Sequence, residues 1–152
     1  MDYKIVELKE KKVTGISRKT TNENMQAVSD IGQVWGEFIG MGVCESIPNK
    51  ADTSTIGLYA DYEGDFTKPY MFLAGCEVTK FTGDSKLTEK TILAGKYAMF
   101  SVRGHIQQAV GAAWNEIWSM NLDRAYTTDF ELYHNNSQDM NDQFIDIYIS
   151  LK

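Results

Sequence analysis

The sequence predicts an α+β domain in which two strand-helix-strand-strand repeats form one curved, mostly antiparallel sheet. Two amphipathic helical stretches, separated by runs of alternating apolar and polar residues, favour this fold class. The same order of elements occurs at about residues 1–78 and again at about 90–152, which indicates an internal duplication within one domain of 152 residues. Two such units would pack both helices on the sheet and leave a central cleft, a common ligand site.

The first half begins with alternating strand residues over 3–19 and continues in an amphipathic helix over 23–39. Residues at spacings of three and four predict one buried face on this helix. The residues of that face are Met25, Val28, Gly32, Trp35 and Phe38. Strands over 55–62 and 70–78 follow, and the turn-rich link between them predicts an antiparallel hairpin.

The second half repeats this order after a polar link over 79–89. A strand lies within 92–103, a helix follows over 105–120, and strands over 126–134 and 143–151 form a closing hairpin. The expected buried face of the second helix consists of Ile106, Val110, Ala113, Trp114 and Ile117, with Trp118 beside it.

Short local matches accompany the repeated order of elements. Trp35 falls near the position of Trp114, and Gly57-Leu58-Tyr59 occupies the slot of Asp129-Phe130-Glu131. Because short matches arise by chance, the predicted duplication depends mainly on the repeated order of elements.

Charge and composition argue against several classes of function. The net charge of -6 and the pI of about 4.9 disfavour nucleic-acid binding, and no apolar run is long enough to cross a membrane. Cys44 and Cys76 lack zinc spacing, and His105 and His134 have no partners at ligand spacing, so we expect no metal and no cofactor. Both cysteines are expected to be free thiols in a cytoplasmic protein.

Glu131 is the residue on which the functional prediction depends. Phe130 and Leu132 face one side of its strand, and Asp129, Glu131 and Tyr133 face the other. If that second side faces solvent, Glu131 is an ordinary surface acid. If it lines a pocket, the carboxylate is a costly unpaired anion that would attract a cationic or hydrogen-bonding ligand. The alternation alone leaves both interpretations open.

Several motifs occur in a fixed order along the chain. They are Gly57-Leu58-Tyr59, Ala74-Gly75-Cys76-Glu77-Val78, Tyr97-Ala98-Met99-Phe100 with Gly104, Trp114-Asn115-Glu116-Ile117-Trp118, Asp129-Phe130-Glu131-Leu132-Tyr133 and Ile145-Asp146-Ile147-Tyr148-Ile149. In order and spacing, over nearly the whole chain, they resemble the gyrase-inhibitor-like (GyrI-like) small-molecule-binding domain. The same domain is the effector-binding part of AraC-type and MerR-type multidrug regulators.

The resemblance implies a duplicated fold with an aromatic pocket for lipophilic cations and a buried glutamate on a late strand. Glu131 matches that glutamate, and Tyr148 could hydrogen-bond it. The aromatic residues expected to line the pocket are Tyr59, Trp35, Phe38, Trp114, Trp118, Tyr133 and Tyr148. Aromatic residues on helix faces are often core residues instead, so that alternative stays open for the four on the helices.

Three functions fit these features. The favoured one is binding of a small hydrophobic, cationic molecule, as a ligand sensor or sequestering protein rather than an enzyme. The alternatives are a hydrolase that opens cyclopropane-containing DNA-alkylating compounds with Glu131 as general base, and a gyrase-inhibitor-like module with a protein partner. Because residues 1–22 are strand-like and leave no room for the helix-turn-helix of the regulators, direct DNA binding is not expected. We expect a monomer or a weak dimer.

Overall fold

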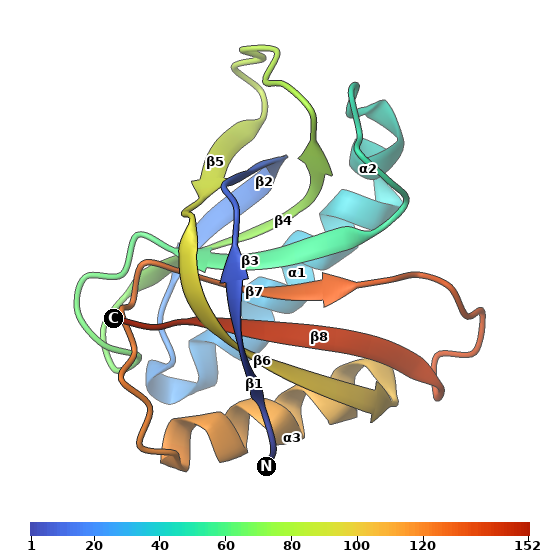
Figure 1. Ribbon diagram of the computed structural model, residues 1–152. Helices are drawn as coiled ribbons and strands as arrows, with labels where there is room; N and C mark the ends of the chain where they lie inside the picture. The colour runs from blue at the N-terminus through green and yellow to red at the C-terminus, as the bar shows by residue number, and fades with distance from the viewer.

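Runs of β-branched and aromatic residues form eight strands, and the two amphipathic stretches form the main helices (Figure 1). The computed structural model describes residues 1–152. The strands are β1 (Lys4–Leu8), β2 (Lys11–Thr20), β3 (Thr55–Ala60), β4 (Tyr70–Val78), β5 (Thr88–Ile92), β6 (Gly95–Gly104), β7 (Thr128–Tyr133) and β8 (Gln143–Ser150). The helices are α1 (Gln26–Gly40), the short α2 (Val43–Ser46) and α3 (Ile106–Ser119), and a 3₁₀ turn over Glu23–Met25 precedes α1.

The strands form one antiparallel sheet in the order β1-β6-β8-β7-β3-β4-β2-β5. Each of the strands β1 to β4 in the first half has a counterpart among β5 to β8 in the second half, in the same order. With these counterparts exchanged, the strand order is the same from either edge of the sheet, so a pseudo-twofold axis passes between β3 and β7. The predicted α+β class and antiparallel sheet are confirmed. Each half has one more strand than predicted. In the first half the strand predicted over 3–19 is divided into β1 and β2, and in the second half β5 forms at the end of the polar link over 79–89 by pairing with β2.

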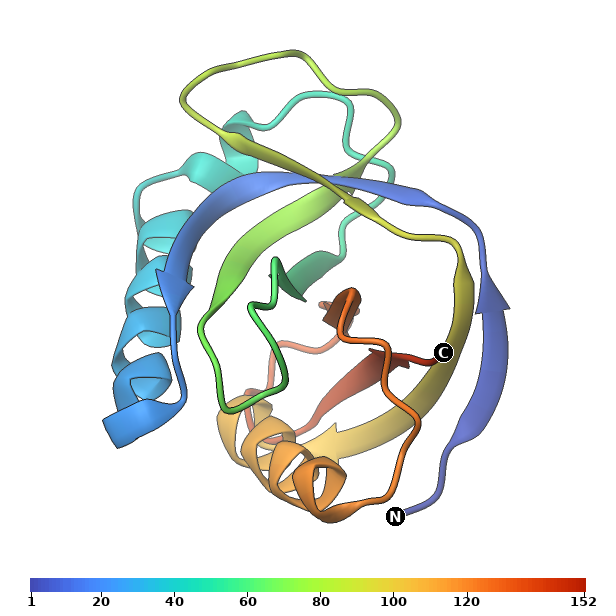
Figure 2. The same cartoon turned by 90° about the vertical axis from the view of Figure 1, so that its left-hand side faces the viewer.

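The first strand of each half pairs with the other half. β1 lies along β6, and β5 lies along β2. In Figure 2 the long strands β2 and β6 arch round the middle of the sheet, with β1 outside β6. This exchange ties the two halves together at both edges of the sheet.

One row of directly opposed residues crosses the centre of the sheet and defines the symmetry. In order, it contains Ile16, Ala74, Gly57, Glu131, Ile147 and Phe100. Three residues of this row belong to each half, and the axis falls between Gly57 and Glu131. Gly57 is therefore the counterpart of Glu131, and Tyr59 is the counterpart of Tyr133. The match of Gly57-Leu58-Tyr59 with Asp129-Phe130-Glu131 was wrong by two residues.

The buried face of α1 differs from the predicted one. Ala27, Val34 and Phe38 are buried, whereas Met25 and Val28 are exposed. A period of 3.6 residues allows two overlapping apolar stripes in this helix, and α1 begins only after Asn24 and Met25, which have positive φ angles. The corresponding face of α3 contains Val110, Ala113 and Ile117, which agrees with the prediction. None of the helices is long and apolar enough to cross a membrane.

Both faces of the sheet are covered. α1 and α3 pack on one face, which we call the helix face. The opposite face is filled by a separate cluster of buried residues, namely Val13, Ile56, Leu58, Ala60, Leu73, Ile92, Tyr97 and Phe130. Alternate residues of the central strands therefore enter two different apolar environments.

The short helix α2 brings Cys44 against β4, where its Sγ atom lies 3.8 Å from Sγ of Cys76. Both cysteines are free thiols, as predicted. Burial raises the pKa of the Cys76 thiol to about 12, so this side chain is protonated at neutral pH. No group of three or more His, Cys, Asp or Glu side chains is arranged to hold a metal ion.

A pair of glycines allows strands β2 and β4 to approach each other closely. Gly15 on β2 lies directly opposite Gly75 on β4, and a Cβ atom on Gly15 would overlap the carbonyl oxygen of Ala74. We expect Gly15→Ala to lower the free energy of unfolding by at least about 2 kcal/mol. Gly36→Ala, at an exposed position of α1 where a Cβ meets no other atom, should raise it by about 1 kcal/mol. Urea unfolding of both variants measures the two effects, and a Gly15→Ala variant as stable as the wild type would contradict this explanation.

Candidate functional site

The Glu131 side chain lies on the helix face at the centre of the sheet and is only 1% exposed. Three neutral side chains donate hydrogen bonds to its carboxylate. The Tyr59 hydroxyl and the Trp114 Nε1 lie 2.7 and 2.6 Å from Oε2, and the Tyr133 hydroxyl lies 2.6 Å from Oε1. The donors come from β3, α3 and β7, so the carboxylate joins both halves of the fold.

The aromatic side chains around Glu131 follow the pseudo-twofold symmetry. The Trp114 ring packs on Tyr59 with 5.0 Å between ring centroids, and the Trp35 ring packs on Tyr133 at 5.3 Å. Each tryptophan comes from the helix of one half and each tyrosine from a strand of the other half. The result is an aromatic cage of two tyrosines and two tryptophans around one carboxylate.

Gly57 provides the space for that carboxylate. It lies directly opposite Glu131 on the neighbouring strand. A Cβ atom on Gly57 would lie 2.8 Å from Oε1 of Glu131 and 3.3 Å from the Phe72 ring. Because Gly57 is also the symmetry counterpart of Glu131, one half supplies the acid and the other supplies the room for it.

Burial raises the pKa of Glu131, and the hydrogen bonds from Tyr133, Tyr59 and Trp114 oppose this increase. The pKa values of Tyr59 and Tyr133 are raised well above the ordinary value, chiefly by burial and also by the charge of Glu131. Both tyrosines therefore keep their protons and act as donors. No lysine, arginine or histidine forms an ion pair with Glu131.

Asp129, two residues earlier on the same face, is the contrasting case. It is fully buried, and Arg124 Nη2 lies 2.8 Å from its Oδ2. The Tyr62 hydroxyl donates to the same oxygen, and the backbone N–H and hydroxyl of Ser150 donate to Oδ1. Of the two buried carboxylates on this strand, only Glu131 lacks a cationic partner.

The other sequence-predicted site residues lie farther from the carboxylate. Phe38 is fully buried in the core beneath α1. Trp118 is 38% exposed and stacks on Phe66 of the β3–β4 loop, with its ring 6.3 Å from that of Trp114. Phe38 therefore occupies the core, as the alternative for the helix aromatics proposed, whereas Trp118 is a partly exposed residue that packs on a loop.

Tyr148 does not form the expected hydrogen bond with Glu131. It lies opposite Phe130 in the β7–β8 pair and stacks on that ring at 4.5 Å. Because directly opposed residues share a face, Tyr148 belongs to the opposite face of the sheet from Glu131. The alternation of each strand was predicted correctly, but the register between the two strands was not available from the sequence.

Sequence reasoning missed three contributors to the site. Gly57 provides space rather than a functional group, and Phe72 packs on both Tyr59 and Trp35 from the sheet side. The pairing of Arg124 with Asp129 was also missed. The available signal was the alternation, which places Asp129 on the face of Glu131, but nothing in the sequence connects the α3–β7 loop to it.

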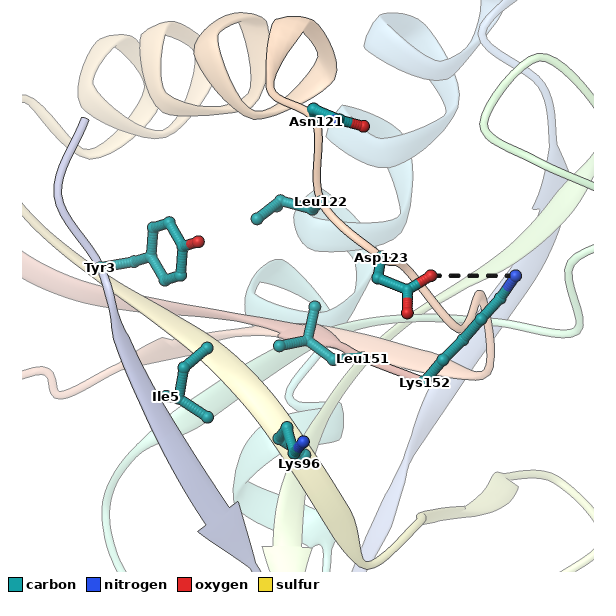
Figure 3. Close-up of a pocket in the computed structure, with 8 residues that line it drawn as sticks. All are labelled: Tyr3, Ile5, Lys96, Asn121, Leu122, Asp123, Leu151 and Lys152. Atoms are coloured by element: carbon teal, nitrogen blue, oxygen red, sulfur yellow. Dashed lines mark ion pairs between the residues drawn. The ribbon is translucent and has the colours of Figure 1, made fainter.

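The central cleft is closed by these side chains, and two hollows lie elsewhere on the surface. One, of about 280 Å³, lies between β1, the start of β6 and the C-terminal end of the chain, and is lined in part by Tyr3, Lys96 and Leu122 (Figure 3). The other, of about 330 Å³, lies beside the start of β4 next to Tyr70 and Met71. Neither contains Glu131. Because this side chain is only 1% exposed, access to the carboxylate requires movement of the aromatic cage.

The raised pKa of Glu131 makes stability depend on pH. Its contribution to stability is fully present below the unfolded-state pKa and is lost as pH rises through the higher folded-state pKa. Glu131→Gln has no such contribution to lose. As pH rises from the unfolded-state pKa of a glutamate to the raised folded-state pKa, the variant should gain stability over the wild type, at up to about 1.4 kcal/mol per pH unit.

Urea unfolding at several pH values measures this difference. The same change at the exposed acid Glu45 serves as the control and should produce no comparable gain. A difference between wild type and Glu131→Gln that stays constant with pH would contradict the raised pKa.

Comparison with known proteins identifies the family. Residues 4–151 match the family model for the integron-associated effector-binding protein Cass2. The integron cassette protein VCH_CASS2, from the mobile metagenome of Vibrio cholerae, is 32% identical; the match covers 99% of this chain and 95% of that one, with a TM-score of 0.76. YobU of Bacillus subtilis is 29% identical over 97% of this chain and 96% of its own length.

A more distant relative has been solved with a ligand. SAV2435 bound to tetraphenylphosphonium is 20% identical and has a TM-score of 0.82, with 100% of this chain and 94% of that chain covered. At this level of identity the likeness shows a common fold. The resemblance to the GyrI-like domain is thus confirmed, and the chain belongs to the family of integron-associated effector-binding proteins.

Proposed function

We propose that this protein binds lipophilic organic cations between α1 and α3, with the Glu131 carboxylate as their counter-ion. The observation that carries the proposal is a buried carboxylate, surrounded by aromatic rings, that has no cationic partner. The relative SAV2435 supports the ligand class, because tetraphenylphosphonium is a lipophilic cation.

The energetics of the site favour cations with a spread charge. Folding has already removed water from the carboxylate, so a cation that binds there loses mainly its own hydration. A lipophilic cation with delocalised charge loses the least hydration. A desolvated cation over an aromatic face gains about 2 kcal/mol. Flat aromatic surfaces impose shape only weakly, so several cations of this type should bind.

Entry of a ligand requires the aromatic rings over Glu131 to turn aside. Gly32 and Gly111 lie one turn before Trp35 and Trp114, and a Cβ atom on either glycine would meet no other atom within 4 Å. Both glycines are exposed, and side chains on a helix lean toward its N-terminus, so neither position carries a side chain that would hinder movement of the indole ring that follows it.

General-base hydrolysis is the alternative use of Glu131. A general base must take a proton from a bound water. Three side-chain donors already engage the Glu131 oxygens, which favours a fixed anion that holds a cation over a base that activates water. Incubation with cyclopropane-containing compounds, followed by mass spectrometry, separates the two functions. A product formed by the wild type but not by Glu131→Gln would support hydrolysis.

The charge of Glu131 should dominate the affinity for cations. Glu131→Gln keeps the shape of the side chain and removes its charge. We expect this variant to bind tetraphenylphosphonium at least about tenfold more weakly, a loss of about 1.4 kcal/mol, in isothermal titration calorimetry. Triphenylmethanol, a neutral molecule of related shape, should lose much less affinity, and Glu45→Gln should bind both as the wild type does. An unchanged affinity for tetraphenylphosphonium would exclude Glu131 as the counter-ion.

The affinity for cations should also decrease as the pH is lowered. The bound cation favours the carboxylate form of Glu131, so a proton and the cation compete for the same site. Because burial raises the pKa of Glu131, this competition begins above the ordinary titration range of a glutamate. Below that raised pKa, the affinity for tetraphenylphosphonium should drop by about tenfold per pH unit. Titration calorimetry at several pH values tests this, with Glu131→Gln as the pH-independent control. An affinity that does not change across this range would show that binding does not depend on the carboxylate form.

A further inference from the structure

Arg124 contains the only buried side-chain nitrogen or oxygen atoms without a hydrogen-bond partner. The residue is 7% exposed, and its Nη2 is engaged with Asp129. Nε and Nη1 are buried and have no acceptor. These two nitrogens carry three N–H groups, and buried donors of a charged group are rarely left without acceptors in folded proteins.

The unpaired donors lie next to the proposed cation site. The Arg124 guanidinium lies 4.2 Å from the ring centre of Tyr126 and 6.0 Å from that of Trp114, whose Nε1 bonds Glu131. Its partner Asp129 precedes Glu131 by two residues on the same face, which separates the two backbone positions by about 7 Å. The Trp114 ring is therefore next to both groups, because its Nε1 bonds the unpaired anion and its centre lies 6.0 Å from the guanidinium that carries the unpaired donors.

The contacts of Arg124 hold its side chain in place but provide no hydrogen-bond acceptor for Nε and Nη1. The Asp129 carboxylate is already saturated by Arg124, Tyr62 and the two donors of Ser150, so it offers the remaining N–H groups nothing more. The Tyr126 ring packs against the guanidinium and offers it no hydrogen-bond acceptor. The in-plane N–H groups of Nε and Nη1 therefore stay without acceptors. Donors fixed in this way suit an oxygen acceptor that arrives with a ligand.

We propose that Arg124 is an acceptor-binding subsite of the cation site, so that preferred ligands carry a carbonyl or carboxylate oxygen on an aromatic arm beside the cationic centre. This inference rests on the proposed function, because the same ligand reaches both Glu131 and Arg124. The arm takes the place of the Trp114 ring, which lies next to both charges. A ligand that has a cationic centre but no oxygen acceptor would interact with Glu131 and leave the Arg124 donors unpaired.

A matched series of ligands tests this without any mutation. The 4-methylbenzyl, 4-(methoxycarbonyl)benzyl and 4-carboxybenzyl derivatives of triphenylphosphonium share one cation and differ only at the end of one arm. We expect the wild type to bind the ester or the carboxylate at least about fivefold more tightly than the methyl compound in titration calorimetry. Preference for the ester indicates a carbonyl subsite, and preference for the carboxylate indicates an anion subsite.

Variants assign the preference to Arg124. Arg124→Met combined with Asp129→Asn removes the unpaired donors together with both charges of the buried pair, so the oxygen-bearing ligands should lose their advantage while the methyl compound binds as before. If that variant does not fold, Arg124→Lys, which keeps a cation for Asp129 and removes the planar Nε and Nη1 donors, should reduce the advantage. Glu131→Gln should weaken all three ligands and preserve their ratio.

The outcomes separate this inference from the proposed function. Equal affinities of the three ligands for the wild type would overturn the acceptor subsite and leave cation binding intact, as expected if buried water satisfies Arg124. An undiminished preference in the variant that replaces Arg124 would also overturn it. Binding of none of the three would remove both proposals.

Discussion

The arrangement at the centre of this protein depends on one costly interaction, the burial of the Glu131 carboxylate without a cation. Desolvation of a lone carboxylate is expensive, and here three neutral donors offset part of that cost. Those donors fix the positions of a tyrosine on β3, a tryptophan on α3 and a tyrosine on β7. The missing side chain at Gly57 follows from the same interaction, because any Cβ there would press on the carboxylate.

Duplication explains why the cage is symmetric and why the charge is not. The pseudo-twofold axis repeats the tyrosine two residues after Gly57 and Glu131 and repeats the tryptophan on each helix. A second carboxylate at the position of Gly57 would face Glu131 directly, and two buried like charges at such a distance do not both ionise. An acid in one half and a glycine in the other retain a single anion next to the axis, where it accepts hydrogen bonds from aromatic side chains of both halves.

The sequence pattern predicted the fold class, and the family resemblance identified the central acid. The sequence was insufficient wherever the answer depended on register or on which face was covered. The alternation around Glu131 placed it with Asp129 and Tyr133, but only the helices packed above show that this face is buried. Tyr148 was assigned to the wrong face because strand pairing decides that choice. In α1 two apolar stripes overlap, so periodicity alone could not select the one containing Val34 and Phe38. Edge strand β5 was missed because its polar residues resemble a link.

The two buried acids of β7 show what a bound cation would change. Asp129 has Arg124 as its partner, and its charge is balanced within the fold. Glu131 is in the opposite state, and its raised pKa expresses the unfavourable free energy of the unpaired anion. Each unit of that increase corresponds to about 1.4 kcal/mol. A cation at Glu131 would recover part of this free energy, which is why the instability of the empty site and its affinity for a cation have the same origin.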